Sequence, residues 1–510
     1  MRTRSIAVSL FLSITVTSIA QTFNRPVPAG VPPYEFIRYD DADHGYYLTA
    51  PFYLGTGPTD PATLLPKPIL ILDADGYILW FARIDIRSLV DFKYFPADDL
   101  YGYTAFQSPQ DIRFVLMDRD FQPVDSFTTV NSFPPDVHDF QITQNGTYLI
   151  SGLSDKVVDL SGYLINGEPG SAVTHAEGFV VQEFDQEHNL LFQWDSNDYI
   201  HPSLGYESFG YNPDGYDYCH GNAIEEDDDG NLLISFRHLN AVYKINRQTG
   251  DVIWQLGGKT SSFTFVNDPG FSGQHDVRRL PNGNLTVFDN ANTSAPPRVS
   301  RGVEYALDTV NWTATRVWEY QYTPGFFARA MGSHRTTPDR NHLINYGMSF
   351  RPNPSFVLTD DDGNLLSQVT FPDSIMSYRS FLEDIPFDVN RPEISCSQGD
   401  GMAVLSAPPG FDRYEWSNGA TADMAVITQP GVYQVWVDHG IGMLGSEPFT
   451  IDDINNACRL NPATEPEPDQ NREITGYFDL MGRRIAAPRI GEVYVVRYRD
   501  GWSGLRVRGE

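Results

Sequence analysis

Four residues that lie far apart in this sequence share a chemistry suited to the transfer of an anionic group. His138, His220 and His275 each stand at the start of a run that leads into an Asn-Gly or Asp-Gly turn, and Arg237 follows one such turn. Histidine can act as nucleophile, general acid or general base near neutral pH. Arginine presents a fork of donors that matches tetrahedral oxyanions. The set predicts sulfuryl or phosphoryl transfer if the fold brings these residues together.

The stretch HGNAIEEDDDGNLLISFR, from His220 to Arg237, shows how such residues can meet. An Asp-Gly pair before an apolar run is the strongest short-range signal for a β-hairpin. The antiparallel return predicts that Arg237 lies at the same end of the hairpin as His220. By the same argument Asp289 and Asn290 return beside His275.

The same turn pattern recurs along the chain and predicts a repeated β unit. The segment from residue 220 to 258 divides into four short strands, near residues 221–226, 231–237, 241–247 and 251–257. Four antiparallel strands in about 40 residues match one blade of a β-propeller. A period near 55 residues predicts about six blades between residues 35 and 385. The turns stand at Asp75-Gly76, Asn145-Gly146, Asp229-Gly230, Asn282-Gly283 and Asp362-Gly363.

Residues at the same position of successive repeats are predicted to lie close together, because a propeller arranges the first strands of its blades around one axis. His334 stands at the phase of the other three histidines. The predicted catalytic residues are His138, His220, Arg237 and His275, and the predicted substrate-binding residues are Asn222, His334 and Arg335. Three other histidines, His201, His238 and His342, are expected to be structural or exposed.

Composition limits the fold class and the partners. The chain has 510 residues, which predicts more than one domain, and is rich in Gly, Pro, Tyr and Phe without long apolar helical periodicity. These features predict an all-β protein. The formal net charge of −30 disfavours nucleic acid and anionic membranes as partners.

The N-terminus reads as a secretory signal peptide over residues 1–20. Arg2 and Arg4 precede an apolar run at residues 6–16, and small residues at 18–20 offer a cleavage site. The apolar run is too short to span a bilayer, although a retained anchor is the alternative. No later stretch is apolar enough to span a membrane.

The pattern of residues changes after the predicted propeller, which covers residues 21–385. Short strands and Gly/Pro turns at residues 390–458 predict a small Ig-like β-sandwich, in which Cys396 and Cys458 can pair after export. An acidic linker follows at 459–471, and a basic, strand-rich segment occupies 472–510. Cys219 is left over and is expected to be a buried, unreactive thiol.

The segments VHDFQITQNGTYLISG, CHGNAIEEDDDGNLLISFR, INRQTGDVIWQLGGK and GQHDVRRLPNGNLTVFDN resemble the bacterial arylsulfate sulfotransferase (ASST-like) family. The resemblance implies a six-bladed propeller that moves sulfate from a phenolic sulfate ester to a phenolic acceptor by a ping-pong route. It implies no nucleotide donor and no cofactor. It also implies that His275 is transiently sulfated, while His138, His220 and Arg237 bind the sulfuryl group and assist proton transfer.

The last segment resembles the C-terminal sorting domain of type IX secretion cargo. The resemblance rests on the Gly-Arg-Arg turn at 482–484, the strand GEVYVVR and the final Arg-Val-Arg. It implies that the type IX secretion machinery is a partner. Export across the periplasm and outer membrane, followed by release or attachment at the cell surface, is the expected route.

Two other functions are compatible with the same pattern. A non-catalytic surface propeller would bind glycan or protein and would turn over no aryl sulfate. A metal- or quinone-dependent propeller enzyme is the other alternative, since INRQTGDVIW resembles a quinoprotein blade motif in one clear copy. The histidines lack His-x-His or HExxH spacing, so the site is predicted without a metal although spacing alone leaves one open.

Overall fold

A computed structural model of the chain describes residues 21–53, 67–165, 167–350, 352–387, 389–399, 401–458, 474–479, 483–489, 493–498 and 503–507. The predicted signal peptide and acidic linker lie outside these residues. The described part is almost entirely β, as the sequence predicts, with a single short α-helix, α1 (Ser196–Tyr199). No helix of this part is long and apolar enough to cross a membrane.

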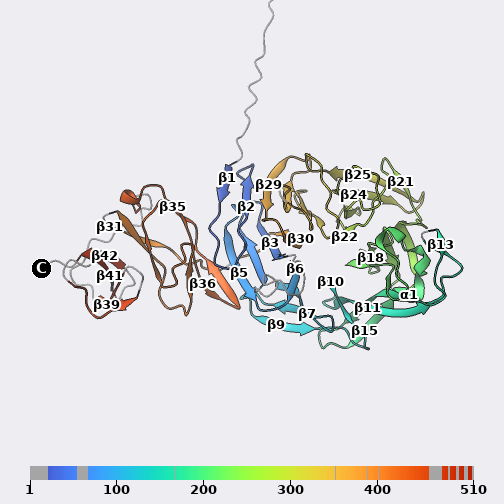
Figure 1. Cartoon of the computed structure of the whole chain (residues 1–510), viewed down its shortest axis with the longest axis horizontal. Helices are drawn as coiled ribbons and strands as arrows, with labels where there is room; N and C mark the ends of the chain where they lie inside the picture. The colour runs from blue at the N-terminus through green and yellow to red at the C-terminus, as the bar shows by residue number, and fades with distance from the viewer. Residues whose placement is uncertain are drawn as a thin grey trace, which may run out of the picture.

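Six sheets of the described chain stand around a common centre (Figure 1). Their innermost strands contact one another in a closed circle, so that residues distant in sequence face the same central region. In chain order these strands are β6 (Ser88–Phe95), β10 (Pro135–Ile142), β17 (Gly221–Glu226), β22 (His275–Arg279), β26 (Ser333–Thr336) and β30 (Ile375–Glu383).

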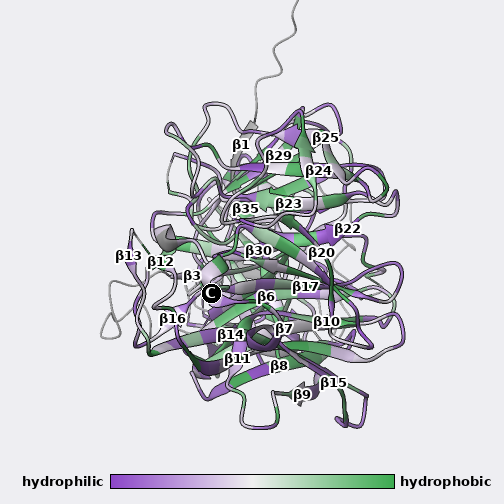
Figure 2. Ribbon diagram, turned by 90° about the vertical axis from the view of Figure 1, so that its right-hand side faces the viewer, coloured by the Kyte–Doolittle hydropathy of each residue, from purple (hydrophilic) through white to green (hydrophobic). Residues whose placement is uncertain are grey.

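Each sheet runs outward from its innermost strand mainly as an antiparallel meander. The strands are largely hydrophobic and the connecting loops largely hydrophilic (Figure 2). The hydrophobic side chains of neighbouring sheets therefore pack together in buried cores. The outer strands are β7 (Leu100–Ser108), β8 (Asp111–Met117) and β9 (Pro123–Phe127); β11 (Tyr148–Val158), β14 (Thr174–Phe184) and β15 (Leu190–Asp195); β18 (Leu232–Phe236), β19 (Ala241–Ile245) and β20 (Val252–Gly257); β23 (Leu285–Asp289), β24 (Arg301–Asp308) and β25 (Thr313–Tyr320), with β21 (Thr264–Val266) at the edge; and β27 (His342–Asn345), β28 (Phe356–Thr359) and β29 (Leu365–Thr370).

The circle is closed by pairing the two ends of this part of the chain. Strand β29 pairs with β2 (Glu35–Arg38), which pairs with β1 (Gln21–Asn24). Strand β30 in turn begins the sheet formed by β3 (Tyr46–Tyr53), β4 (Lys67–Leu72) and β5 (Ile78–Ile84). Two sheets therefore each combine an early and a late segment of the chain.

The predicted four-strand unit at residues 221–257 is confirmed as the sheet β17–β20. Its first turn is held by hydrogen bonds from Asp227 N to Asn231 O at 2.7 Å and from Gly230 N to Asp227 O at 2.8 Å. Gly230 has a φ of +79°, a left-handed conformation that glycine adopts without steric cost. The glycines of the other four recurrent turns also have positive φ.

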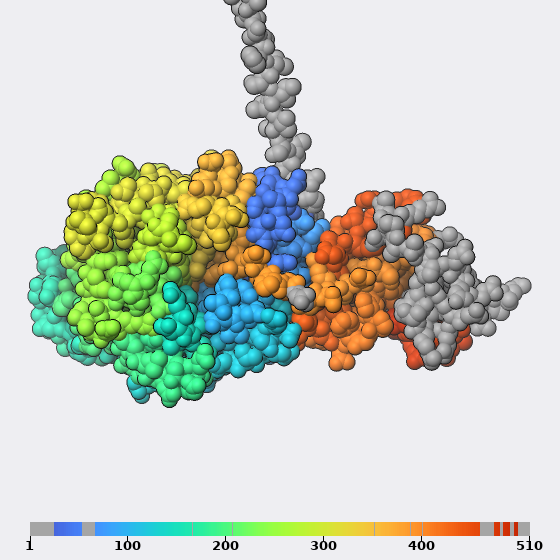
Figure 3. All heavy atoms as spheres, turned by 180° about the vertical axis from the view of Figure 1, so that it is seen from behind, coloured from blue at the N-terminus to red at the C-terminus, as the bar shows by residue number. Residues whose placement is uncertain are grey.

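A C-terminal lobe continues the sheet of β5. Strand β37 (Gly442–Gly445) pairs with β5 through Met443 and Leu444, and is followed outward by β36 (Val435–His439) and β33 (Tyr414–Trp416). The lobe, orange to red in Figure 3, lies directly against the blue N-terminal sheet. Its other strands are β31 (Ser395–Gly399), β32 (Met402–Ser406), β34 (Met424–Ile427), β35 (Gly431–Tyr433) and β38 (Phe449–Ile451).

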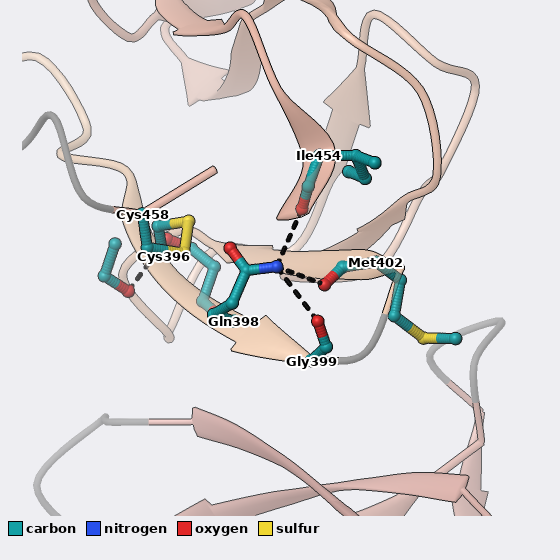
Figure 4. The surroundings of a disulfide bond; sticks show 8 residues. Cys396, Gln398, Gly399, Met402, Ile454 and Cys458 are labelled. Atoms are coloured by element: carbon teal, nitrogen blue, oxygen red, sulfur yellow. Dashed lines mark hydrogen bonds between the residues drawn. A yellow bond between two sulfur atoms is a disulfide. The ribbon is translucent and has the colours of Figure 1, made fainter. Parts of the chain in front are cut away.

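The lobe contains a disulfide between Cys396 and Cys458, whose Cα atoms are 5.4 Å apart, so the two predicted partners do pair. Beside it, Gln398 Nε2 donates to the carbonyl oxygens of Gly399, Met402 and Ile454 at 2.7–3.1 Å (Figure 4). These bonds tie the turn η4 (Ile454–Asn456) to β31. Beyond the lobe, β39 (Ile474–Phe478), β40 (Arg484–Ile485), β41 (Val493–Tyr498) and β42 (Ser503–Val507) form a further antiparallel sheet.

Candidate active site

The hairpin β17–β18 brings His220 and Arg237 to one end of the central region, as the sequence predicts. Arg237 N donates to His220 O at 3.0 Å, so the two residues face each other across the end of the hairpin. His220 has a φ of +50°. A non-glycine residue in this conformation costs about 1–3 kcal/mol and is characteristic of functional sites.

His138 and His220 form a pair of neighbouring imidazoles, each supported by a carboxylate. His138 Nδ1 lies 2.8 Å from Asp136 Oδ2, and His220 Nδ1 lies 2.5 Å from Asp217 Oδ2. The two rings meet edge to face with centroids 4.8 Å apart. Since each Nδ1 faces a carboxylate, the Nε2 atoms remain to exchange protons with a ligand.

Asp136 makes the imidazole of His138 a suitable proton store. Burial lowers the pKa of His138, but the charge and hydrogen bond of Asp136 outweigh burial, so the net pKa is raised. Burial raises the pKa of Asp217, yet the nearby His220 and His238 bring it down to about 2. Asp217 therefore stays ionised, while His138 keeps its proton at higher pH than a free imidazole does.

His275 opens β22 and is held as a neutral imidazole. Its Nδ1 lies 2.7 Å from Asn290 Oδ1, and Met331 N donates to its Nε2 at 3.2 Å. An imidazole nitrogen can accept a hydrogen bond from a backbone N–H only through a lone pair. Nε2 of His275 is therefore unprotonated, and the proton of the neutral ring is on Nδ1. Burial, and then the charge of Arg237, lowers the pKa of His275 well below its usual value.

Arg237 supplies positive charge and a buried donor beside these imidazoles. Its Nη1 lies 2.8 Å from His238 Nε2, and its Nη2 donates to Arg329 O at 3.0 Å. The Nε atom is buried and has no hydrogen-bond partner among the described residues. Burial lowers the pKa of Arg237 to about 10, which leaves it charged at neutral pH. An anionic oxygen is the acceptor that this donor lacks.

The structure does not bring His334 to this cluster. Its ring is fully buried between two neighbouring sheets, where it stacks on Trp318 at 5.0 Å and where its Nδ1 lies 3.2 Å from Val303 O. Its Nε2 lies 3.0 Å from His342 Nδ1. Burial lowers the pKa of His334 to about 3, so it is a neutral part of the packing.

Asn222 and Arg335 lie deeper than the imidazoles and link the innermost strands. Asn222 Nδ2 donates to Gln274 O at 2.8 Å, and Arg335 Nη2 donates to Asp276 Oδ1 at 2.7 Å. Asp276, directly after His275, has a φ of +59°. Both residues thus hold the start of β22 in place, and among the described residues neither forms a hydrogen bond with an imidazole of the cluster.

A network of buried charges fills the innermost strands behind the site. Asp139 accepts from Lys93, Arg278 and Arg379 at 2.8–3.1 Å. Arg379 also reaches the carbonyl of Asn222 at 2.5 Å. Although burial raises the pKa of Asp139, these cations lower it well below its usual value. The paired charges connect the strands that hold the catalytic candidates.

A small cavity of about 70 Å³ opens beside the imidazole pair. Glu177 is among its lining residues, and burial together with the charges of Asp217 and Asp136 raises the pKa of Glu177 to about 7. Such a carboxyl can exchange protons at neutral pH. The polar and sulfur-bearing side chains of the lining are Asp136, His138, Glu177, Asp217, Cys219 and His220.

Sequence reasoning missed several of these groups. Asp136 and Asp217 precede His138 and His220 by two and three residues, and this short spacing was a usable signal. His238, expected to be structural or exposed, stacks on His220 with centroids 4.5 Å apart. Nothing in the sequence marks the approach of Met331 to His275.

Asp217, His220 and His238 offer ligand atoms within 4.8 Å of one another, a spacing that fits a metal ion. The donor atoms are already engaged, however. His220 Nδ1 bonds Asp217, and His238 Nδ1 lies 2.7 Å from the carbonyl oxygen of Asp217 while its Nε2 faces Arg237. A metal would have to displace these hydrogen bonds, so the trio is described more simply as part of the imidazole cluster.

The family model of arylsulfotransferases (ASST) matches residues 101–371, which is more than half of the chain. The chain belongs to the arylsulfotransferase family. Membership supports a sulfotransferase activity in general, and small-molecule substrates fit such a family. The match covers His138, His220, Arg237 and His275, which the structure brings together.

The solved structures that match share little sequence with this chain. A protein of unknown function from Bacteroides caccae is 12% identical, with 66% of this chain and 97% of that chain covered and a TM-score of 0.40. A virginiamycin B lyase from Staphylococcus aureus is 10% identical, with coverage of 73% and 96% and a TM-score of 0.34. A putative 6-phosphogluconolactonase from Bacteroides fragilis is 14% identical, with coverage of 72% and 99% and a TM-score of 0.35. None of the curated proteins matches this chain.

Proposed function

We propose that this arylsulfotransferase moves a sulfuryl group from a phenolic sulfate ester to a phenolic acceptor through a sulfated His275. The observation that carries the proposal is the protonation state of His275. Its Nε2 lone pair accepts the N–H of Met331, and its pKa is well below the usual value. A buried imidazole that stays unprotonated is a competent nucleophile toward sulfur.

In the first half-reaction Met331 N–H releases the Nε2 lone pair of His275, a bond forms between Nε2 and sulfur, and the bond from sulfur to the phenolic oxygen breaks. The leaving oxygen takes a proton from the imidazolium of His138 or His220. Arg237, with its unpaired buried Nε, binds the sulfuryl oxygens. In the second half-reaction the acceptor hydroxyl attacks sulfur, its proton passes to the same imidazole, and the bond to Nε2 breaks.

The proposal extends to the architecture and to the location of the protein. We interpret the six sheets around one centre as a six-bladed β-propeller, with the C-terminal lobe as an Ig-like sandwich. The N-terminal signal peptide and the type IX sorting segment support export through the periplasm by a bacterium with an outer membrane. The mature protein is then secreted or attached to the cell surface, with the type IX machinery as its partner.

The test is an assay of purified protein with 4-nitrophenyl sulfate and phenol, followed by intact-mass detection of a sulfated enzyme at neutral pH. We expect release of nitrophenol, which depends on phenol, and a sulfuryl adduct on His275 when phenol is omitted. Turnover without an adduct on His275 would contradict the proposed intermediate. No turnover of any aryl sulfate would favour the glycan- or protein-binding alternative, and metal analysis with a visible spectrum tests the metal or quinone alternative.

A further inference from the structure

Only the oxygen of the Asn290 side-chain amide faces His275, and the amide nitrogen points elsewhere. Asn290 follows β23 directly, and its Oδ1 lies 2.7 Å from His275 Nδ1. Its Nδ2 donates to Ala328 O at 2.8 Å and to Met331 O at 3.0 Å. Each hydrogen of the Asn290 amide nitrogen is therefore donated to a carbonyl oxygen. A carbonyl oxygen can only accept a hydrogen bond, so its partner must be a donor.

These bonds leave Asn290 no alternative orientation. A flipped amide would place Oδ1 against two carbonyl oxygens and the NH₂ group against His275, which loses two hydrogen bonds in a buried site. Oδ1 can only accept, so His275 Nδ1 must carry the proton. The tautomer of His275 thus follows from two carbonyl groups in the loop between β25 and β26.

The backbone around Asn290 is itself rigid. Asp289 Oδ1 accepts from Ala291 N at 2.8 Å and from Ser272 N at 3.0 Å, and Arg301 Nε bonds Asp289 Oδ2 at 3.0 Å. Ser300 Oγ donates to Asn290 O at 3.1 Å. The amide is therefore fixed at both its backbone and its side chain, as a residue that orients a nucleophile requires.

We propose that Asn290 is a positioning residue that selects the Nδ1–H tautomer of His275 and thereby makes Nε2 the atom that receives the sulfuryl group. The tautomer itself is a property of the free enzyme, whereas the assignment of the sulfated atom rests on the proposed function. Asn290 does not touch the reacting sulfur; it acts through the imidazole.

The first experiment needs no substrate. Nitrogen-15 NMR of the full chain labelled at histidine reports which nitrogen of His275 carries the proton, with His275→Gln to assign the signal. We expect a protonated Nδ1 and an unprotonated Nε2 in the unaltered protein, where Met331 N–H also donates to Nε2. In Asn290→Ala we expect a mixture of tautomers, because the variant loses the acceptor for Nδ1–H and the two bonds that hold Ala328 and Met331 in place. An unaltered protein with its proton on Nε2 would overturn the inference without any further variant.

The second experiment measures sulfation of His275 by 4-nitrophenyl sulfate in a single turnover. We expect Asn290→Ala to slow sulfation by about 10- to 100-fold, with the donor concentration at half-saturation little changed, and to place part of the adduct on Nδ1. Asn290→Asp keeps an acceptor for Nδ1–H and should retain the adduct on Nε2, although its second oxygen then faces the carbonyls of Ala328 and Met331 and lowers the stability of the variant. Normal speed and exclusive Nε2 sulfation in Asn290→Ala would refute the role.

Asn345 provides a matched control because its amide makes the same kind of bonds without a histidine. It lies at the end of β27, and its Nδ2 donates to the carbonyl oxygens of Ser377 and Tyr378 at 3.0 and 3.1 Å. Asn345→Ala should lower the thermal midpoint as much as Asn290→Ala and leave the sulfation rate within about threefold. An equal loss of rate in both variants would reduce Asn290 to a structural role. If no protein forms an adduct at all, the proposed function fails while the NMR result still decides the tautomer.

Discussion

His275 and His334 begin from the same position in the repeat and end in opposite environments. Each stands at the start of an innermost strand, in β22 and β26. His275 lies within the cluster formed with Arg237, whereas His334 is packed between sheets against Trp318. The difference arises because the register of β22 shifts between His275 and Arg278, whereas β26 pairs with β27 without interruption from Ser333 to Thr336.

These two histidines show that the position of a residue within a repeat determines at which end of the strand it lies. This position does not determine the face of the sheet from which the side chain extends. In β26 it is Arg335 that points toward the centre and bonds Asp276. In β22 the backbone of Asp276 is left-handed, and the register shifts between His275 and Arg278. This irregularity reorients His275 relative to the strand that follows it.

The largest effect that separates the two histidines is expected from His275→Ala. Loss of the nucleophile should lower kcat with 4-nitrophenyl sulfate by about 10³-fold or more, because no other group can form the covalent intermediate. Steady-state kinetics of the folded variant measures this loss. His188→Ala, which removes an exposed histidine paired with Asp125, is the control and should retain full activity. Substantial turnover by His275→Ala would move the nucleophile elsewhere in the cluster.

The next largest effect is expected at Arg237. Arg237→Met should lower kcat/KM by about 10²- to 10³-fold, since it removes charge and donors for the sulfuryl oxygens. Arg237→Lys should recover only part of this loss because lysine lacks the planar fork. Arg247→Met is a matched control at a turn of the same sheet, where the arginine pairs with Glu183 and Glu226. Equal losses for Arg237→Met and Arg247→Met would point to stability instead of substrate binding.

A smaller, pH-dependent effect is expected from Asp136→Asn. The raised pKa of His138 depends on Asp136, so the variant should move the alkaline limb of kcat/KM to lower pH. The imidazolium is present below its folded pKa and is lost as pH rises through it, and the stabilisation that it gives the fold disappears in the same window. The other groups near His138 are His220, Asp217, Tyr378 and Arg379, which the variant leaves in place.

The pH profile of kcat/KM for 4-nitrophenyl sulfate checks this expectation. Asp155→Asn is the control, since Asp155 makes a similar bond of 2.8 Å to the histidine at position 175 but on the exposed outer part of a sheet. Its profile should coincide with that of the unaltered protein. An unmoved alkaline limb in Asp136→Asn would remove His138 as the proton donor.

The smallest effect on activity is expected from His334→Ala. The variant should keep kcat within about threefold and lose about 1–3 kcal/mol of unfolding free energy, because it leaves a cavity and unpaired polar groups between two sheets. Denaturant unfolding and kinetics on the same preparation separate the two outcomes. A loss of activity above about 100-fold with unchanged stability would restore His334 to the site.

Local patterns in the sequence were sufficient for the hairpin that joins His220 and Arg237. The Asp-Gly turn and the apolar strand define it without any distant contact, and the predicted strands match β17–β20. The roles of Asn290 and Met331 at His275 were not predictable in this way. They depend on a loop 38 to 41 residues further along the chain that returns to β23, and no periodicity reports such a tertiary contact. The face of His334 was missed for a related reason, since the sequence does not mark the register shift that distinguishes β22 from β26.

The way in which the sheets close has a consequence for how the chain folds, and through folding for the export route proposed above. Strands β1–β3 are among the first to leave the ribosome, but their partners β29 and β30 are made more than 300 residues later. Until those partners arrive, two sheets lack the strands that join them, and contacts of such sequence separation form slowly. The arrangement delays the final closure until synthesis of nearly all of this part is complete. For a chain that is threaded through a membrane before it folds, late closure prolongs the interval in which it can still be translocated.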